Sequence, residues 1–285
     1  MRIRPRSMSR EMKAVFSGQR RTAGGCPSAR FDRHLDSRHH KERNVSEQEL
    51  LEEIRKIDTP TITNVVATYP GNELCLSLYN PWTMNWYTDN SLQCWYPELG
   101  AIAGYAVTCV YSVPDPNFPA RDFTEVLEAM DNGPKPSIFC FEQRFPPELA
   151  NKVGLAGGNM TSNMMTCGAI GAITNGPSRD IHEIRPMEFQ YLTNGITPGH
   201  GPQAIQAVQV PVHIAGMDIA PGEIIHMDEN GAVKFPAEHL EAVVTNAKAL
   251  IEKEETTIAR VLAVKGQGLE AMRKARAGDD PYIKK

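Results

Sequence analysis

The stretch that decides the fold runs from Gly157 to Glu183 and reads GGNMTSNMMTCGAIGAITNGPSRDIHE. Paired glycines precede the segment NMTSNMMTC, which is long enough for two helical turns. The small-residue run GAIGAITN then predicts a strand, and the sequence GPS turns the chain at its end. Arg179, Asp180 and Glu183 therefore emerge at a strand terminus, where a rigid scaffold commonly supports functional side chains.

Short strands and helices alternate on both sides of this stretch. Upstream, AIAGYAVTCVYS (101–112) and SIFCFE (137–142) predict strands, and DFTEVLEAM between them predicts a helix. Downstream, AIQAVQVPVHIAGM and GEIIHMDENGAVKFP predict β-structure, with DENG (228–231) as a tight turn. A long helix is expected after Pro236, and its polar continuation EKEETTIARVLA is typical of a helix that projects toward a neighbouring subunit. The alternation predicts one α/β domain.

Two further helices are expected where ordered structure begins. SEQE, which starts at Ser46, is a capping box, and DTPTITNVV starts a second helix with Pro60 in its first turn. Residues 79–96, YNPWTMNWYTDNSLQCWY, then contain all three tryptophans of the chain. A loop this aromatic is typical of a packed lid or a subunit contact, and substrate stacking is the alternative.

The first 44 residues differ in composition from the rest of the chain. They hold twelve Lys and Arg against four Asp and Glu, whereas the whole chain has a net charge of −4. They contain no long apolar run, so they predict neither a secretory signal nor a membrane span. We interpret residues 1–44 as a basic, disordered arm, or as sequence upstream of a start at Met8 or Met12. An organellar transit segment is the alternative.

The composition and the motifs exclude several classes of function. A net charge of −4 gives no reason to expect that the whole molecule binds nucleic acid. The chain has neither a P-loop nor a glycine-rich dinucleotide motif, so nucleotide binding and methyl transfer have no support. Six cysteines without zinc-ligand spacing favour a reduced, cytoplasmic setting. His200, His213 and His226 lack metal-ligand spacing, and Asp228 and Glu229 belong to the predicted turn, so structural roles are favoured for all five.

The residues of the opening stretch suit the binding of an anion and a divalent metal. The amides of Asn159 and Met160 would lie near a helix N-terminus, where free N–H groups and the helix dipole attract a carboxylate or phosphate. Arg179 offers a planar charged fork, suited to a carboxylate or a developing enolate oxygen. Asp180 and Glu183 are three residues apart and offer hard oxygen ligands to Mg²⁺ or Mn²⁺. A glycine turn needed for packing and an Arg179–Glu183 surface salt bridge are the alternatives.

The order of these residues resembles the motif of the RraA-like family: Gly158, twenty residues, Arg179-Asp180, two residues, then Glu183. GAIGAITNGPSRD is similar to that family's glycine, strand and Arg-Asp core, and PVHIAGMDIAPGEIIHMDENGAVKFP (211–236) is similar to a second family segment. The resemblance runs from about Ser46 to Ala263. The family contains regulators of ribonuclease E activity, class II 4-hydroxy-4-methyl-2-oxoglutarate / 4-carboxy-4-hydroxy-2-oxoadipate aldolases and related oxaloacetate decarboxylases.

The resemblance implies a fold and an assembly. The fold would be a single swivelling β/β/α sandwich domain with helical N- and C-terminal extensions. This catalytic domain would span residues 45–265, and residues 266–285 would form a C-terminal tail. The chain would assemble as a homotrimer or a hexamer without contact with a membrane, and the active sites would lie between subunits. A neighbouring subunit would contribute to each site, with Glu254 or Glu255 as candidates.

The resemblance also implies a set of roles for the site residues. The backbone from Gly157 to Met160 would bind the carboxylate of a 2-oxo acid, and Arg179 would contact its keto oxygen. Asp180, with Glu183 directly or through water, would hold Mg²⁺ or Mn²⁺. These roles describe a metal-dependent lyase that breaks a carbon–carbon bond, by aldol cleavage or decarboxylation, through a pyruvate-type enolate.

Three departures from the family's aldolases bear on which reaction is expected. Gly158 stands where the aldolases tend to have an acid, Asn175 stands where their turn has an acid, and TITNVV replaces a Ser-Asp-Ala-Leu-like segment. Glycine at position 158 together with Glu183 resembles the decarboxylase-like subgroup. A non-catalytic regulator that binds RNA or an acidic partner through the basic arm is an alternative, as is a metal-dependent hydratase or isomerase of a related oxo acid.

Overall fold

The structure, a computed structural model, describes residues 45–69 and 71–277. These residues belong to one compact unit, Asn44–Lys285. The interpretation of residues 1–44 as a basic arm concerns residues outside the described ones. Within the described ranges, no helix combines the length and the apolar character needed to cross a bilayer.

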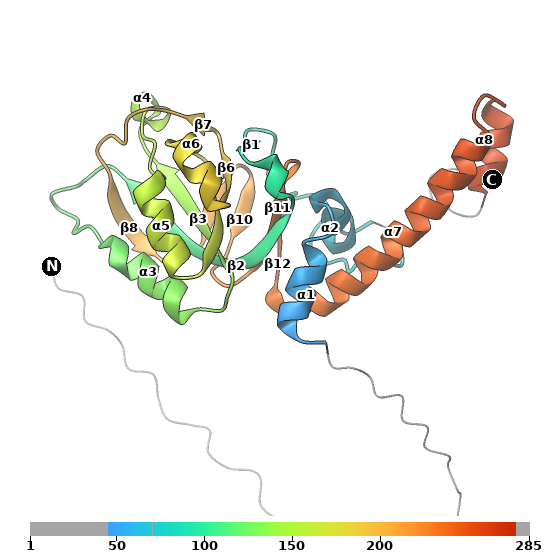
Figure 1. The fold of residues 1–285 in the computed structure, drawn as a ribbon, viewed down its shortest axis with the longest axis horizontal. Coiled ribbons are helices and arrows are strands. Elements are labelled where there is room, and N and C mark those ends of the chain that lie inside the picture. Colours follow the sequence, from blue (N-terminus) through green and yellow to red (C-terminus); the bar gives the residue numbers. More distant parts are fainter. Residues whose placement is uncertain (1–44, 70, 278–285) are drawn as a thin grey trace, which may run out of the picture. The chain divides into compact units, whose positions relative to one another are not determined.

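A mixed sheet lies at the centre of the fold, with the strand order β1-β6-β4-β3-β2-β11-β12 and with β8 also paired to β2 (Figure 1). Its strands are β1 (Gln93–Cys94), β2 (Ile102–Ser112), β3 (Ser137–Arg144), β4 (Ala169–Thr174), β6 (Gln190–Thr193), β8 (Ala204–Val208), β11 (Ile224–Asp228) and β12 (Gly231–Phe235). Neighbours among β2, β3, β4 and β6 are parallel, so the carboxyl ends of these strands lie along one edge. The candidate site residues follow β4 at this edge.

The long strand β2 holds two antiparallel strands on its outer side. Its first half pairs with β11, from Ile102 to Tyr105, and its second half pairs with β8, from Cys109 to Ser112. One strand can pair with both because it is eleven residues long and because the pairing with β8 includes a register shift.

Successive side chains of β3 point to opposite faces of the sheet, and each face has its own core. Phe139 and Phe141 point to one face, where they share a core with Met130 of α3 and Met164 of α5. The helices that accompany this half of the chain are α3 (Phe123–Asn132), α4 (Pro147–Ala150), α5 (Gly158–Thr166) and α6 (Ile181–Ile184). Ile138 points to the opposite face and packs in a second core with a two-stranded layer, β9 (Val212–Ile214) and β10 (Met217–Ile219). The helices, the sheet and this hairpin form the expected β/β/α sandwich.

Helices from both ends of the chain pack together beside β12. They are α1 (Glu47–Ile54), α2 (Thr59–Val66) and α7 (Leu240–Ala263), and α8 (Leu269–Arg276) follows α7. Their buried apolar residues form one core with Phe235 of β12. The capping box of Ser46 with Glu49 and the place of Pro60 in the first turn of α2 are confirmed. The chain therefore has the helical extensions expected at each end, and the sequence-based boundary at residue 265 stays a prediction.

A buried polar network joins α2 to β11. The Thr59 amide donates to the Asp228 carboxylate over 2.8 Å. His226 Nε2 lies 3.0 Å from the carbonyl oxygen of Ile54, so Nε2 carries the proton and Nδ1 accepts from the Thr59 hydroxyl at 2.9 Å. Burial lowers the pKa of His226, which favours the neutral ring. Asp228 also pairs with Gly231 across the predicted tight turn. The structural roles expected for His226 and Asp228 are therefore confirmed.

The aromatic segment is packed over part of its length. Trp86 is buried and stacks on Tyr79 with ring centroids 5.3 Å apart. Trp95 donates from its indole nitrogen to the Thr193 hydroxyl over 2.7 Å. Trp82, in contrast, is 87% exposed. The remaining short elements are η1 (Pro97–Leu99), β5 (Pro177–Ser178), η2 (Arg185–Met187), β7 (Gly195–Ile196) and η3 (Ala237–His239).

Candidate functional site

The first turn of α5 meets the Arg179-Asp180 turn at the carboxyl end of β4. Gly157 is the N-cap of α5, and no side chain caps the helix at this residue. The Gly158 amide instead donates to Asp180 Oδ2 over 3.3 Å. The positive end of the helix dipole therefore faces a carboxylate of the protein itself.

The carboxylates of Asp180 and Glu183 occupy the space that side chains at Gly157 and Gly158 would need. A Cβ added to Gly157 would lie 2.3 Å from Asp180 Oδ2, and a Cβ added to Gly158 would lie 2.1 Å from Glu183 Oε1. Ordinary van der Waals contact begins at 3.4 Å. The paired glycines are therefore required sterically, because the helix backbone and the two acids approach each other this closely.

The backbone of Asp180 holds an uncommon conformation. Its φ of 59° and ψ of 32° are left-handed, which aspartate tolerates better than most residues do. This turn redirects the chain from β5 into the short helix α6, where the Asp180 carbonyl accepts from the amides of Glu183 and Ile184. The turn thus brings two carboxylates three residues apart to the same end of α5. Strained conformations of this kind commonly occur at functional sites.

Arg179 pairs with Asp180. Its Nε lies 3.2 Å from Asp180 Oδ2, but the orientation gives no hydrogen bond, and the two side chains are 31% and 33% exposed. Among the described residues, this is the ion pair that Arg179 makes, so the predicted alternative of an Arg179–Glu183 surface salt bridge does not describe the site. This Nε is also buried, so its contact with the Asp180 carboxylate is shielded from solvent.

Hydrogen bonds fix both sides of the site. The Ser178 hydroxyl and the Arg179 amide both donate to the carbonyl oxygen of Ala156, over 2.6 Å and 3.3 Å. The Thr161 hydroxyl donates to the Gly157 carbonyl at 2.9 Å and lies 2.9 Å from the Tyr191 hydroxyl, which therefore donates to Thr161. Burial raises the pKa of Tyr191, so this hydroxyl keeps its proton. These hydrogen bonds hold the turn at residues 178–179 and the first turn of α5 in fixed positions.

Asn175 connects β3 to the turn that precedes Arg179. Its side-chain oxygen accepts from the Gln143 amide at 2.7 Å, and its side-chain nitrogen donates to the Gln143 carbonyl at 3.1 Å. An amide can make both bonds, whereas a carboxylate can only accept. The pairing with Gln143 therefore gives a structural reason for asparagine at the position where the resemblance to the aldolases leads to the expectation of an acid.

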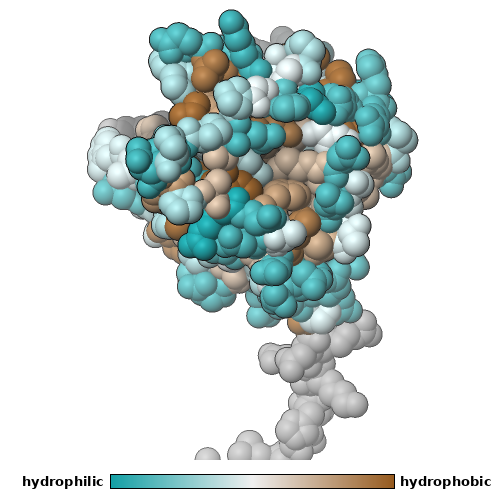
Figure 2. All heavy atoms as spheres, turned by 90° about the vertical axis from the view of Figure 1, so that its left-hand side faces the viewer, coloured by the Kyte–Doolittle hydropathy of each residue, from teal (hydrophilic) through white to brown (hydrophobic). Residues whose placement is uncertain are grey.

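A pocket of about 410 Å³ opens beside the first turn of α5. Asn159 and Met160, two of the predicted binding residues, line it together with Tyr111 at the end of β2 and Arg121. Figure 2 shows the molecule from the side on which α3 and β8 lie, and apolar side chains gather there within a mainly hydrophilic surface. Arg121 was not predicted, because it lies far from α5 in the sequence and no motif marks it.

The donor set of the site fits a hard divalent cation. Asp180 and Glu183 offer carboxylate oxygens, which Mg²⁺ and Mn²⁺ prefer, and Mg²⁺ commonly binds through one or two carboxylates and several waters. In the described part of the chain, no group of three or more His, Cys, Asp and Glu side chains is arranged to hold a metal. The two acids would therefore supply part of an octahedral shell, with water and substrate oxygens as the remaining ligands.

The three histidines considered in the sequence lie apart from these carboxylates. His200 contacts the carbonyl oxygen of Gly201, and His213 pairs with Asp218 at 2.6 Å. His226 belongs to the buried network beside α2. The buried contacts of His226 are those of the structural histidine that the sequence favoured, whereas His200 and His213 are exposed.

A family model, proteins of related sequence and a solved structure all match this chain. Residues 82–234 match the family model of the RraA-like proteins, which is described as Aldolase/RraA. An uncharacterised protein, MJ0644, of Methanocaldococcus jannaschii is 32% identical over 114 residues, which are 40% of this chain and 54% of that protein. A protein of Thermus thermophilus named 4-hydroxy-4-methyl-2-oxoglutarate aldolase is 28% identical over 86 residues, 30% of this chain and 52% of that protein. The matches thus span about half the length of these two relatives.

A solved structure shares the fold. It is that of RraAS2 from Streptomyces coelicolor, described as an unusual member of the RNase ES inhibitor RraA protein family. It superposes with a TM-score of 0.55 at 19% identity, over 73% of this chain and 94% of that one. At this identity, the likeness concerns the fold alone.

Proposed function

This chain belongs to the RraA-like family, and from that premise we propose that it is a divalent-metal-dependent lyase that breaks a carbon–carbon bond of a 2-oxo acid. The observation that carries the proposal is the convergence of Arg179, Asp180 and Glu183 on the glycine-marked start of α5. The reaction proceeds through a pyruvate-type enolate, by aldol cleavage or by decarboxylation.

The start of α5 binds the substrate carboxylate. The amides of Asn159 and Met160 follow Gly158 in the first helical turn, where N–H groups lack partners within the helix. The helix dipole favours an anion at the same place. The pocket beside the helix start is lined by Asn159 and Met160 but not by Arg179, Asp180 or Glu183.

Arg179 acts on the oxygen that gains charge. When the carbon–carbon bond breaks, its electron pair enters the pyruvate-type enolate, and negative charge develops on the former keto oxygen. A guanidinium beside that oxygen stabilises the charge, and the permanently charged, partly exposed side chain of Arg179 is suited to this role. Aldol cleavage and decarboxylation share this enolate, so one arrangement supports both reactions.

Asp180 and Glu183 would hold Mg²⁺ or Mn²⁺. A metal bound there supplies Lewis-acid polarisation of the substrate carbonyl. The two carboxylates are positioned by the left-handed turn at Asp180 and by α6, while Gly157 and Gly158 leave them space. The chain's own contribution is therefore to present both acids and Arg179 to the same end of one helix.

The proposal includes an assembly and a compartment. A homotrimer or hexamer would complete each site with residues of a neighbouring subunit. The cytoplasmic setting follows from the cysteine pattern, and the five cysteines in the described ranges are free thiols.

Pyruvate formation tests the proposal directly. The purified chain, stripped of metal and then supplied with Mg²⁺ or Mn²⁺, is offered oxaloacetate and 4-hydroxy-2-oxo acids, and pyruvate is followed by a coupled assay. We expect metal-dependent pyruvate formation that EDTA abolishes and that Arg179→Ala lowers by about 10²- to 10³-fold.

A nearby arginine provides the control. Arg185 pairs with Glu98 and lies over the Tyr96 ring, away from the two glycines, so Arg185→Ala should retain turnover. Absence of EDTA-sensitive pyruvate with every substrate would reject the lyase proposal. Pyruvate formation that is equal in Arg179→Ala and the unaltered chain would reject the assigned role of Arg179.

A further inference from the structure

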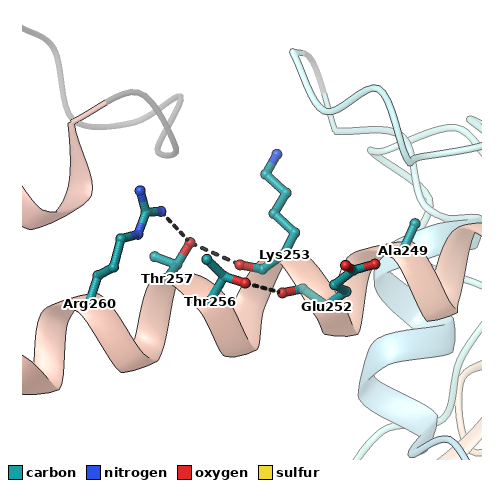
Figure 3. A pocket seen from close by; sticks show the side chains of 6 residues that line it. All are labelled: Ala249, Glu252, Lys253, Thr256, Thr257 and Arg260. Carbon is teal, nitrogen blue, oxygen red and sulfur yellow. Dashed lines mark hydrogen bonds between the residues drawn. The ribbon is translucent and has the colours of Figure 1, made fainter.

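Two hollows on the described surface differ in how they are built. The first, of about 390 Å³, lies along α7, and its lining residues all belong to the segment 249–260 (Figure 3). The hydroxyls of Thr256 and Thr257 donate to carbonyl oxygens of their own helix, those of residues 252 and 253. This hollow is therefore one face of a single helix, and these two hydroxyls already have acceptors.

The pocket beside α5, in contrast, is lined by four separate segments. They are the end of β2, residues 120–123 at the start of α3, residues 155–163 and residues 203–205 at the start of β8. The Arg121 amide donates to the Ile205 carbonyl over 2.8 Å and so ties two of these segments together. The volume of about 410 Å³ lies within the range of about 300–1,000 Å³ that is usual for small-molecule sites. Tertiary packing thus forms a pocket of a size suited to a small ligand.

Apolar side chains form the inner wall of this pocket. Leu155 and Ile205 are each 5% exposed, and they share one core with Tyr111 and Phe141. The Tyr111 ring meets the Phe141 ring edge to face, with centroids 5.9 Å apart. The other apolar lining residues are Ala120, Phe123, Met160 and Ala204. A wall of this composition favours the apolar body of a ligand, because the contact removes apolar surface from water.

One polar group lies within the apolar wall. Tyr111 is 4% exposed, and among the described residues its hydroxyl makes no hydrogen bond. The hydroxyl oxygen is not completely covered, and the open space beside it is the pocket that Tyr111 lines. Burial raises the pKa of Tyr111 well above its ordinary value, so the hydroxyl keeps its proton and is a donor. Buried hydroxyls normally have partners, so this donor lacks the acceptor that an occupant of the pocket would supply.

The rim of the pocket is polar and carries a positive charge. Asn159, Asn163 and Gln203 are exposed, and Arg121 is the charged residue among those that line the pocket. Arg121 Nη1 pairs with Glu125 Oε2 at 3.1 Å, and a guanidinium has further N–H donors for a second carboxylate. A carboxylate at this rim would stay partly hydrated, whereas the apolar wall would penalise it. The polarity of the pocket therefore favours a ligand with its charge at the outer end.

We propose that this pocket binds a small apolar carboxylic acid that carries a carbonyl or hydroxyl oxygen remote from its carboxylate. The apolar body lies against Leu155 and Ile205, and the inner oxygen accepts a hydrogen bond from the Tyr111 hydroxyl. The carboxylate stays at the rim beside Arg121. None of the three charged residues of the proposed active site lines this pocket. The binding site is thus a second one, and it does not depend on the proposed function.

Two probes of the same shape test the role of Tyr111. 4-Acetylbenzoate has an acceptor oxygen opposite its carboxylate, and 4-isopropenylbenzoate has a CH₂ group in place of that oxygen. Binding of each probe to the metal-free full chain is measured by isothermal titration calorimetry. We expect a Kd of about 1 mM or lower for 4-acetylbenzoate. Tyr111→Phe should lower the preference for the acetyl over the isopropenyl probe by about 3- to 10-fold, the effect of one hydrogen bond.

A second tyrosine provides the matched control. Tyr79→Phe also removes a hydroxyl, but this hydroxyl donates to the Lys234 carbonyl, and neither residue lines the pocket. The preference between the two probes should therefore stay unchanged in Tyr79→Phe. Circular dichroism checks that each variant retains its fold. Tyr111→Phe should melt at the temperature of the unaltered chain, because among the described residues the lost hydroxyl has no partner.

Two arginine variants test the outer end of the ligand and the place of the site. Arg121→Gln, at an exposed side chain, should weaken binding of 4-acetylbenzoate but leave the binding of neutral 4-acetylbenzamide unchanged. Arg179→Ala should bind 4-acetylbenzoate as the unaltered chain does, because Arg179 does not line the pocket. The proposal is overturned by absence of saturable binding up to about 10 mM. It is also overturned by loss of binding in Arg179→Ala, or by an equal probe preference in Tyr111→Phe and the unaltered chain.

Discussion

Replacement of Gly158 by alanine tests the packing of the site most directly. The added Cβ would lie 2.1 Å from Glu183 Oε1 and 2.4 Å from its Cδ, well inside ordinary contact, which begins at 3.4 Å. The atoms it meets belong to the end of a flexible side chain, so Glu183 rather than the helix backbone is expected to move. The substitution therefore displaces one carboxylate of the proposed metal pair without removing it.

The expected effects on stability and on metal binding differ in size. Alanine in place of glycine contributes up to about 1 kcal/mol to a helix, and overpacking costs about 1–3 kcal/mol. The free energy of unfolding of Gly158→Ala should therefore fall by no more than about 2 kcal/mol. Displacement of a ligating group should lower Mn²⁺ affinity by at least about 10- to 100-fold, the range for lost support of a ligand.

The assay is pyruvate formation as a function of Mn²⁺ concentration, together with urea unfolding of the metal-free chain. Gly195→Ala is the matched control, because a Cβ at Gly195 meets nothing within 4 Å. We expect a higher Mn²⁺ requirement for Gly158→Ala and an unchanged one for Gly195→Ala. The double variant Gly158→Asp/Glu183→Ala supplies a carboxylate from the helix side and should recover part of the lost affinity. A Gly158→Ala chain with an unaltered Mn²⁺ requirement would refute the reasoning.

Three further predictions concern stability. Burial lowers the pKa of His226, so between its folded-state pKa and about 6.5 the unfolded chain binds the proton that the folded chain excludes. The melting temperature should therefore decrease as the pH falls below about 6.5, with a shallower decrease in His226→Gln; equal slopes would contradict this role. Asn175→Asp keeps the shape but loses the donor to the Gln143 carbonyl, so urea unfolding should show a loss of about 1–3 kcal/mol, and full stability would contradict the pairing. Trp86→Ala should lower the free energy of unfolding by about 3–5 kcal/mol, whereas Trp82→Ala, at a side chain 87% exposed, should change it by less than about 0.5 kcal/mol; similar values for the two would be contrary evidence.

Local patterns in the sequence predicted much of the secondary structure. The capping box at Ser46 and the position of Pro60 depend on residues a few places apart, and both are present as expected. The two strand-like runs upstream became β2 and β3, and the tight turn between β11 and β12 joins Asp228 to Gly231. These features were predictable because hydrogen bonding and burial over a few residues determine them.

The relation between Gly158 and Glu183 was not predictable from the same patterns. The two residues are 25 positions apart, and the sequence shows only that position 158 is a glycine. The structure places the Glu183 carboxylate in the space that a side chain at Gly158 would fill. This position of the Glu183 carboxylate depends on the left-handed turn at Asp180 and on the angle between α5 and α6. Neither feature leaves a periodic signal in the sequence.

The pocket and the core faces depended on tertiary structure as well. Tyr111, Arg121 and Asn159 come from three separate segments, the strand β2, a loop and the helix α5, which meet only when the chain folds. β2 is buried along nearly its whole length, so its composition could not show that two different strands pair along its outer side.

The sequence by itself determined the α/β alternation, the family resemblance and the identity of the charged residues that follow β4, because each depends on residues close together in the chain. Only the tertiary structure decided which groups face one another. It set Asp180 and Glu183 against the paired glycines and paired the Asn175 side chain with the backbone of Gln143 on β3. It also left Ile258 and Leu262 of α7 more than half exposed. The physical reason is that steric fit and burial are properties of surfaces, and the surfaces form only when distant segments pack together.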